Sequence, residues 1–187
     1  MDLPFGDERT RQFVNNVGLV TSNGQYGYDI MACEWTHQVS YSPGLIAVCI
    51  TAGDATYANI EETKEFGINL CASDQNALSS LSGTYSGKEI NKIGALKEAG
   101  FNFFKAKTIN VLMVEGAAMN AECKLFKKIK LGDHTTFIGE AVELYPVKDK
   151  EPIIYHKQKY WKLGENITKP PQQEIDRISK IIEKYKR

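Results

Sequence analysis

The chain has 187 residues, with 23 basic and 23 acidic side chains, so its formal net charge is zero. A balanced charge gives no overall field that would favour nucleic acid or an anionic membrane as a partner. The length fits a single domain with a sizeable core, and the four cysteines include no CxxC pair of the kind found in zinc and dithiol sites.

The N-terminal sequence lacks a basic segment followed by an apolar stretch, which is the pattern of a secretory signal. No apolar run approaches the length that spans a membrane. We therefore expect one cytoplasmic domain over residues 1–187, with neither nucleic acid nor a membrane as partner. Within it, a C-terminal helix at about residues 172–187 is expected to form an appendage.

The first part of the chain has the pattern of successive strands. Residues 13–22 favour a strand, and Asn23-Gly24 fits a two-residue hairpin turn because both residues tolerate positive φ. Residues 28–43 mix small, sulfur-bearing, aromatic and hydroxyl side chains and are expected to supply one or two further strands. Residues 45–51 form a continuous apolar run with β-branched side chains, which is typical of a buried strand.

Helices and strands alternate in the middle of the chain. Asp54 is a plausible N-cap for the first helix, because its side-chain oxygens can accept from free backbone amides. Gly100 provides a stop for the last helix of this region. The pattern predicts, in order, a helix over residues 55–64, a strand over 66–71, a helix over 75–82, a loop over 83–91 and a helix over 93–99.

The C-terminal part favours hairpins followed by a tail helix. Gly132-Asp133 fits a hairpin turn, and residues 172–186, after Pro170-Pro171, carry isoleucines at helical spacing. Many strands, few helices and hairpin turns together predict an antiparallel barrel, mainly β with added helices. The strands expected here cover residues 110–114, 118–130, 135–145, 153–155 and 160–163.

Several familiar catalytic and metal-binding patterns are absent or incomplete. The loop that begins at Gly83 has one residue too few between its glycines for a phosphate-binding P-loop, and Glu89 stands where a hydroxyl would hold magnesium. His37, His134 and His156 are too scattered for a metal site, and no G-x-S-x-G elbow presents a serine. We therefore expect no metal and no catalytic side chain, and the simplest interpretation of His134 is a solvated or capping residue.

Two features indicate a flat ligand and a phosphate. The small side chain of Ala32 allows a ring to approach the backbone, and the hydroxyls of Thr36 and Ser40 can fix its polar edges. The helix after Asp54 presents free amides and the positive end of its dipole, to which Thr56 can add a hydroxyl for a phosphate. An ordinary Asp54 cap explains the same residues equally well.

Five segments, in this order, resemble the flavin reductase-like family of FMN-binding split barrels, which includes the flavoredoxins. Three positions depart from its pattern, because Asp29 stands where Asn is usual, Gly44 replaces a second Pro, and Asp54 occupies an often basic position. The matching segments are residues 30–36 (N-x-M-[TA]-x-x-W), 39–43 (V-S-[FY]-x-P), 55–56 (a small residue and Thr at a helix start), 65–70 (E-F-x-[VI]-N) and 134–140 (H-x-x-[FI]-x-G-E).

The resemblance covers about residues 17–164 and implies an antiparallel, Greek-key split β-barrel that forms a homodimer. It further implies FMN, or else FAD, as cofactor and NADPH or NADH as electron donor, with the electron acceptor left open. The expected function is that of a flavin reductase or a flavoredoxin-like electron carrier. Because the isoalloxazine itself carries the hydride chemistry, such a protein needs no catalytic side chain. A flavin-dependent oxidase related to pyridoxamine phosphate oxidase and a non-catalytic FMN-binding module stay open as alternatives.

The resemblance also assigns site residues. His134 is expected on the side where the nicotinamide docks. The residues expected to bind the flavin are Asp29, Met31, Ala32, Cys33, Glu34, Trp35, Thr36, Ser40, Thr51, Ala55, Thr56, Ser82, Gly83 and Lys88.

Overall fold

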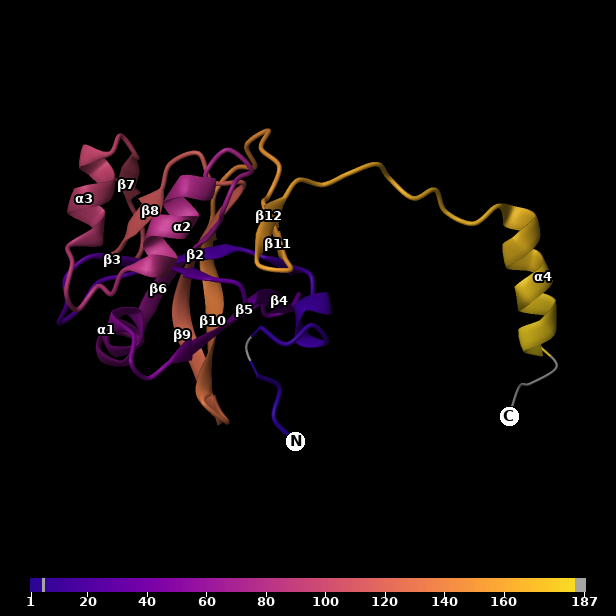
Figure 1. The fold of residues 1–187 in the computed structure, drawn as a ribbon, viewed down its shortest axis with the longest axis horizontal. Coiled ribbons are helices and arrows are strands. Elements are labelled where there is room, and N and C mark those ends of the chain that lie inside the picture. Colours follow the sequence, from indigo (N-terminus) through magenta and orange to yellow (C-terminus); the bar gives the residue numbers. More distant parts are fainter. Residues whose placement is uncertain (5, 184–187) are drawn as a thin grey trace.

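The structure is a computed structural model that describes residues 1–4 and 6–183 (Figure 1). Its centre is an antiparallel seven-stranded sheet with the strand order β3-β2-β6-β9-β10-β5-β4. In chain order these strands are β2 (Gly18–Ser22), β3 (Asp29–Cys33), β4 (Thr36–Ser40), β5 (Leu45–Thr51), β6 (Glu65–Leu70), β9 (Met119–Leu131) and β10 (His134–Leu144).

Two small sheets and several helices surround the central sheet. One small sheet joins β1 (Asn15–Asn16), β11 (Ile154–His156) and β12 (Lys159–Trp161), and the other joins β7 (Phe103–Lys105) and β8 (Leu112–Val114). The helices are the short 3-10 helix η1 (Thr10–Gln12), α1 (Ala55–Thr63), α2 (Asn76–Thr84), α3 (Lys92–Glu98) and α4 (Gln172–Glu183).

The seven-stranded sheet curls around an apolar core without closing. Along β5, Ile46, Val48 and Ile50 are buried and alternate with half-buried residues, as the two-residue period of a strand requires. At the open side, the Cys49 amide donates to the Trp35 carbonyl at 3.1 Å and joins the segment after β3 to β5. The prediction of an antiparallel, mainly β barrel with added helices is therefore confirmed.

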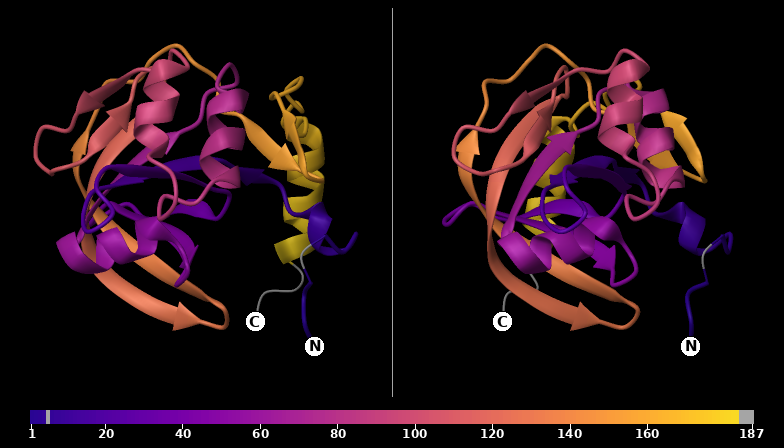
Figure 2. Two further views of the ribbon diagram at one scale, coloured as in Figure 1. Left: turned by 60° about the vertical axis from the view of Figure 1, so that its left-hand side comes forward. Right: turned by 90° about the vertical axis from the view of Figure 1, so that its left-hand side faces the viewer.

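Helices α2 and α3 cover β3 and β2, and Figure 2 shows the two helices side by side above the sheet. Leu78 of α2 and Ile93 of α3 are buried in one cluster with Leu19 of β2 and Ile30 of β3. Helix α1 contributes Ile60 to a second cluster that fills the inside of the curled sheet. Apolar contacts on both sides therefore hold the edge strand β3 in place.

The connection between β2 and β3 differs from the sequence prediction. Ser22 pairs with Asp29, so six residues connect the strands instead of a two-residue turn. Asn59 of α1 holds this loop, because its Oδ1 accepts from the Tyr26 amide at 3.1 Å and its Nδ2 donates to the Gly27 carbonyl at 2.9 Å. A helix later in the chain thus stabilises a wide loop, which local turn chemistry does not reveal.

Other boundaries differ by a few residues. The strand predicted over residues 13–22 is two strands, β1 and β2, which belong to different sheets. Helix α2 continues to Thr84 and takes in part of the predicted loop, and the strand β7 was not predicted. The Gly132-Asp133 turn is confirmed, because β9 and β10 pair directly on either side of it, and β11 and β12 form the predicted hairpin.

Helix α4 stands away from the rest of the molecule at the end of an extended segment (Figure 1). Its isoleucines, Ile175, Ile178, Ile181 and Ile182, are 42–59% exposed, so the stripe has no covering surface within the described chain. Residues 184–187, the end of the predicted tail helix, lie outside the described residues. In the described part of the chain, none of the helices combines the length and apolar character needed to cross a membrane.

Candidate functional site

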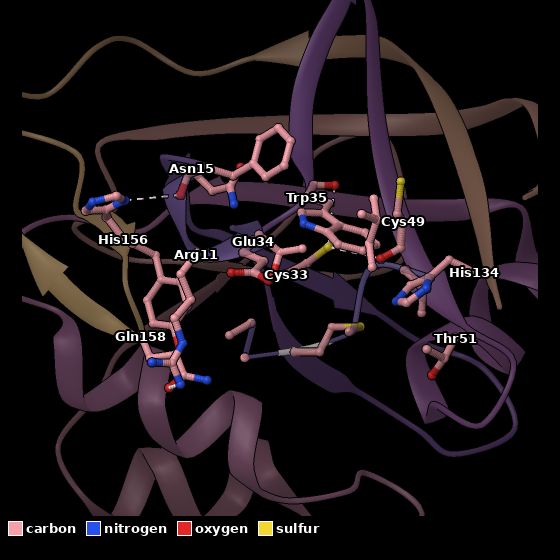
Figure 3. Close-up of a pocket in the computed structure, with 18 of the residues that line it drawn as sticks. Arg11, Asn15, Cys33, Glu34, Trp35, Cys49, Thr51, His134, His156 and Gln158 are labelled. Atoms are coloured by element: carbon pink, nitrogen blue, oxygen red, sulfur yellow. Dashed lines mark hydrogen bonds between the residues drawn. The ribbon is translucent and has the colours of Figure 1, made fainter. Parts of the chain in front are cut away.

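A cavity of about 450 Å³ lies beside the end of β3 and the start of β10 (Figure 3). The N-terminal segment and the β11–β12 hairpin bound it on the other side. This volume is within the range of cavities that hold small organic ligands. The cavity therefore draws on elements from both ends of the chain.

The floor of the cavity is apolar. It contains Met31, Ala32 and Cys33 from β3 and Ile50 from β5. Behind the strand, a Cβ added at Gly83 would lie 3.3 Å from the Ala32 Cβ, so α2 packs closely against β3 at this point. Because Ala32 and Gly83 are both small, α2 can lie close behind β3 and support the floor of the cavity.

Trp35 and His134 form an aromatic wall. Their ring centroids lie 4.7 Å apart with a tilt of 49°, and Trp35 remains 43% exposed. The Nδ1 atom of His134 lies 2.7 Å from Asp133 Oδ1, and this hydrogen bond lowers the pKa of the Asp133 carboxyl. His134 therefore lies at the turn with its ring 25% exposed, in contact with an indole and a carboxylate at the edge of the cavity.

An acidic rim follows β5. The Thr51 hydroxyl donates to Asp54 Oδ2 at 2.6 Å, and both residues line the cavity. Asp54 directly precedes α1, but its side chain makes no capping hydrogen bond to that helix. The prediction of an Asp54 side-chain cap is therefore wrong, because Thr51 engages the carboxylate instead.

The opposite wall is polar and comes from η1 and the β11–β12 turn. Arg11 Nη2 donates to Gln158 Oε1 at 3.0 Å. Figure 3 shows these two side chains on one side of the cavity and His134 and Thr51 on the other, with Glu34 between them. The cavity thus has an aromatic and acidic end and a basic end.

The β11–β12 turn has an unusual backbone. Lys157 and Gln158 have φ values of 51° and 59°, in the left-handed region, which costs a residue with a Cβ about 1–2 kcal/mol. Its neighbour His156 is anchored, because its Nδ1 lies 3.3 Å from the Phe13 carbonyl and its own carbonyl accepts from Trp161 Nε1 at 2.9 Å. The hairpin is thereby tied to the N-terminal segment, whose strand β1 also pairs with β11.

Burial changes the titration of groups in the cavity. It raises the pKa of the Glu34 carboxyl, and it raises the pKa of the Cys33 thiol to about 11. Burial and, secondly, the charge of Glu34 raise the pKa of Tyr155. The Cys33 thiol donates to the Cys49 carbonyl at 3.4 Å and stays protonated near neutral pH, so it is a poor nucleophile.

Seven of the fifteen site residues predicted from the sequence meet in this cavity. They come from the segment 31–35, from the end of β5 and from the start of β10. The predicted residues that line the cavity are Met31, Ala32, Cys33, Glu34, Trp35, Thr51 and His134.

Three other predicted residues meet at a second place, around the first residue of β3. Asp29 Oδ2 accepts from the Thr56 hydroxyl at 2.8 Å, and Asp29 Oδ1 lies 3.2 Å from Lys92 Nζ. Lys92 also donates to the Ser82 carbonyl at 3.4 Å, while the Ser82 hydroxyl has no partner among the described residues. All four residues are buried and none lines the cavity, so the Thr56 hydroxyl binds Asp29 and is not directed at a ligand there.

The remaining predicted residues lie elsewhere. The buried Thr36 hydroxyl donates to the Cys33 carbonyl at 2.9 Å inside the barrel. Lys88 is exposed, with Nζ 5.6 Å from the centroid of the Tyr26 ring, and it lines a separate outer groove. The residues that the structure places outside the cavity in this way are Thr36, Ser40, Ala55, Gly83 and Lys88.

The basic wall was missed by sequence reasoning. Arg11 and Gln158 are 147 residues apart in the chain, and no local pattern relates the two segments. His156 was considered only as a metal ligand. The residues of this wall are Arg11, Asn15, Tyr155, His156, Lys157 and Gln158.

Comparisons with known proteins agree with this architecture. Residues 10–164 match the flavin reductase like domain. The chain is 27% identical over 133 residues to a ferric-chelate reductase (NAD(P)H) of Archaeoglobus fulgidus, covering 68% of this chain and 73% of that protein. Its fold resembles the flavoredoxin of Desulfovibrio vulgaris (Miyazaki F), with a TM-score of 0.76 and 24% identity, covering 90% of this chain and 97% of that one. It also resembles the FMN-binding protein of Thermus thermophilus, with a TM-score of 0.78 and 22% identity, covering 91% and 96%.

The curled antiparallel barrel with an apolar cavity at its open side is the architecture shared with these flavin-binding proteins. Because the family match extends over most of the chain, the protein belongs to the flavin reductase like domain family. It is a flavin reductase-type oxidoreductase.

Proposed function

We propose that the cavity binds FMN and that the protein takes hydride from NADPH or NADH and passes electrons to an acceptor. The observation that carries this proposal is the apolar floor around Ala32 beside the Trp35–His134 wall. A flat, largely apolar ring fits such a floor, because no charged side chain projects from it and Ala32 is small. The residues present therefore fit a flavin.

A bound flavin supplies the hydride chemistry through its isoalloxazine ring. The chain then has to hold the ring, leave one face open and exclude competing reactions. Met31, Ala32 and Ile50 would hold one face, and the half-exposed Trp35 would limit access of water to its edge. His134, fixed by Asp133 and Trp35, lies where a nicotinamide could approach from the open side.

The test is an anaerobic titration of the flavin-loaded protein with NADPH and with NADH, followed by flavin absorbance. A reductase or carrier is bleached by at least one donor. A flavin-loaded protein that neither donor bleaches is the related oxidase or a non-catalytic FMN-binding module, and the reductase proposal is then wrong. Ferric chelates are the first acceptor to assay, because the Archaeoglobus relative is named for them.

We further propose that residues 1–187 form one cytoplasmic domain that works as a homodimer. Two apolar surfaces support self-association. The edge strand β4 exposes Val39, and the adjoining Tyr41 is 92% exposed. Helix α4 carries the uncovered isoleucine stripe and reaches away from its own barrel (Figure 1). Burial of such surfaces against a second copy would stabilise a dimer.

A further inference from the structure

The basic residues of the cavity come from the wall formed by η1 and the β11–β12 turn. Among the described residues that line it, Arg11 and Lys157 are the two Arg or Lys residues. Asp54 and Asp133, which are bound to Thr51 and His134, line the same cavity at the other end, and Glu34 lies between the two ends (Figure 3). The cavity is therefore polarised along its length.

Among the described residues, no carboxylate is in direct contact with either basic side chain. In the part of the chain that the structure describes, neither Arg11 nor Lys157 forms an ion pair. Asp7, four residues before Arg11, is engaged by Arg9 through contacts of 2.9 and 2.7 Å and feels the charge of Arg11 without forming an ion pair with it. Both Asp7 carboxylate oxygens are thus taken by Arg9, so Arg11 has no ion-pair partner in the segment and can engage an anion.

Arg11 is also positioned before any ligand binds. Its Nη2 is held by Gln158, and its Nε is buried without a hydrogen-bond partner among the described residues. A guanidinium has five N–H donors in a rigid plane, so most of them remain available. A fixed, unsatisfied guanidinium beside a second cation is the arrangement that binds phosphate through charge-assisted hydrogen bonds.

We propose that Arg11 and Lys157 bind a phosphate group of a nucleotide whose ring lies on the Ala32 floor. This inference rests on the proposed function, in which both ligands carry phosphate: the flavin at its ribityl end and the nicotinamide donor at its pyrophosphate. The start of α1 is a poorer place for that group, because Asp54 is acidic and the Thr56 hydroxyl is bound to Asp29. The basic wall therefore sets ligand orientation and selects phosphorylated ligands.

The experiment compares phosphorylated and unphosphorylated ligands on matched variants. Arg11→Gln and Lys157→Gln remove the charges, Arg11→Lys keeps a charge, and Lys159→Gln is the control on the same hairpin outside the cavity. FMN and riboflavin are titrated by flavin fluorescence. NAD⁺, NADP⁺ and nicotinamide riboside are titrated by calorimetry, which does not require flavin.

Arg11→Gln should lower the affinity for the phosphorylated ligand about ten- to a hundred-fold, which is the range for loss of a hydrogen bond between charged groups. Lys157→Gln should weaken it less, because Lys157 is exposed, and Arg11→Lys should be intermediate. The affinity of these variants for the unphosphorylated ligands should change less than two-fold. The Lys159→Gln control should bind every ligand within two-fold of wild type.

The flavin titrations and the nicotinamide titrations together show which ligand supplies the phosphate. A loss for FMN but not riboflavin assigns the wall to the flavin, and a loss for NAD⁺ and NADP⁺ but not nicotinamide riboside assigns it to the donor. If the variants bind all ligands as wild type does, or lose affinity equally for phosphorylated and unphosphorylated ligands, the inference is overturned. The proposed function still stands in that case, provided that the wild type binds flavin. If Arg11→Gln does not fold, Arg11→Lys and Lys157→Gln give the same decision. A wild type that binds none of these ligands overturns both.

Discussion

Lys92 Nζ lies 3.2 Å from Asp29 Oδ1, and both side chains are almost completely buried, with 5% and 3% of their surfaces exposed. The contact is an ion pair without the alignment of a hydrogen bond, since Asp29 Oδ1 has no hydrogen-bond partner. This ion pair explains how the fold accommodates Asp29 at a position where the family pattern has Asn. The extra charge is compensated inside the protein by α3 and does not face the cavity.

Breaking this pair should be costly. Lys92→Met leaves Asp29 buried and unpaired, which typically lowers the free energy of unfolding by about 3–5 kcal/mol. The double variant Asp29→Asn/Lys92→Met removes both charges and should recover most of that loss. Urea unfolding at pH 7 measures both values. Equal losses in the single and double variants would show that packing, and not the uncompensated charge, is responsible.

A second buried charge, Glu122, organises the loop before β8. It accepts from the amides of Lys107, Thr108 and Ile109, from the Thr108 hydroxyl and from the Tyr145 hydroxyl. Burial alone would raise the pKa of Glu122, but these hydrogen bonds outweigh it and lower the pKa to about 2. The fold therefore stabilises the ionised form of Glu122.

This shift predicts an acid-dependent stability. Because the folded pKa lies below the value of about 4.3 for a free Glu, the contribution of Glu122 is complete above that value and is lost as the pH falls towards 2. Glu122→Gln should cost about 1.5–3 kcal/mol at pH 7, since hydrogen bonds to a charged group are lost. Its cost should shrink at pH 3, and urea unfolding at both pH values checks this. A pH-independent cost would contradict the ionised assignment.

His134 should affect donor chemistry more than flavin binding. His134→Ala removes the ring that contacts Trp35 at the open side of the cavity. The rate of anaerobic flavin reduction by NADPH in stopped flow should fall at least ten-fold, while FMN affinity changes less than three-fold. Asp133→Asn keeps a hydrogen-bond partner for the ring and is the matched control. Unchanged reduction rates would leave His134 only a structural role beside Trp35.

Helix α4 should contribute to self-association. Full burial of an isoleucine side chain is worth about 1.5–3 kcal/mol, so burial of the isoleucine stripe against a second copy of the chain would stabilise a dimer. Sedimentation at micromolar concentration should show a dimer for the full chain and a weaker one for Ile178→Asp/Ile182→Asp. Arg177→Ala, on the polar side of the same helix, is the control. A monomeric wild type with flavin bound would contradict the proposal.

The sequence predicted the fold well because the fold follows short-range patterns. The apolar run of β5 and the Gly132-Asp133 turn each depend on neighbouring residues alone. The wide loop held by Asn59 was missed because its stabilising contacts come from a helix more than thirty residues later.

The site was predicted in part for the same reason. Ala32 and Trp35 are neighbours in one segment, so their shared cavity follows from one strand and its extension. The interpretation of Thr56 as a phosphate ligand did not foresee that its hydroxyl binds Asp29. The basic wall at Arg11 depends on a contact between the two ends of the chain, which no local pattern contains.

The central claim is that flavin binds on the Ala32 floor, and FMN titration of flavin-free protein tests it most directly. Ala32→Leu adds bulk where the floor meets α2, which should displace the floor and weaken FMN binding at least ten-fold, while Ala32→Ser, of similar size, should stay within three-fold of wild type. Since Ala32 also faces Gly83 of α2, thermal unfolding by circular dichroism must show that both variants are folded. A folded Ala32→Leu protein that binds FMN as tightly as wild type would contradict the account.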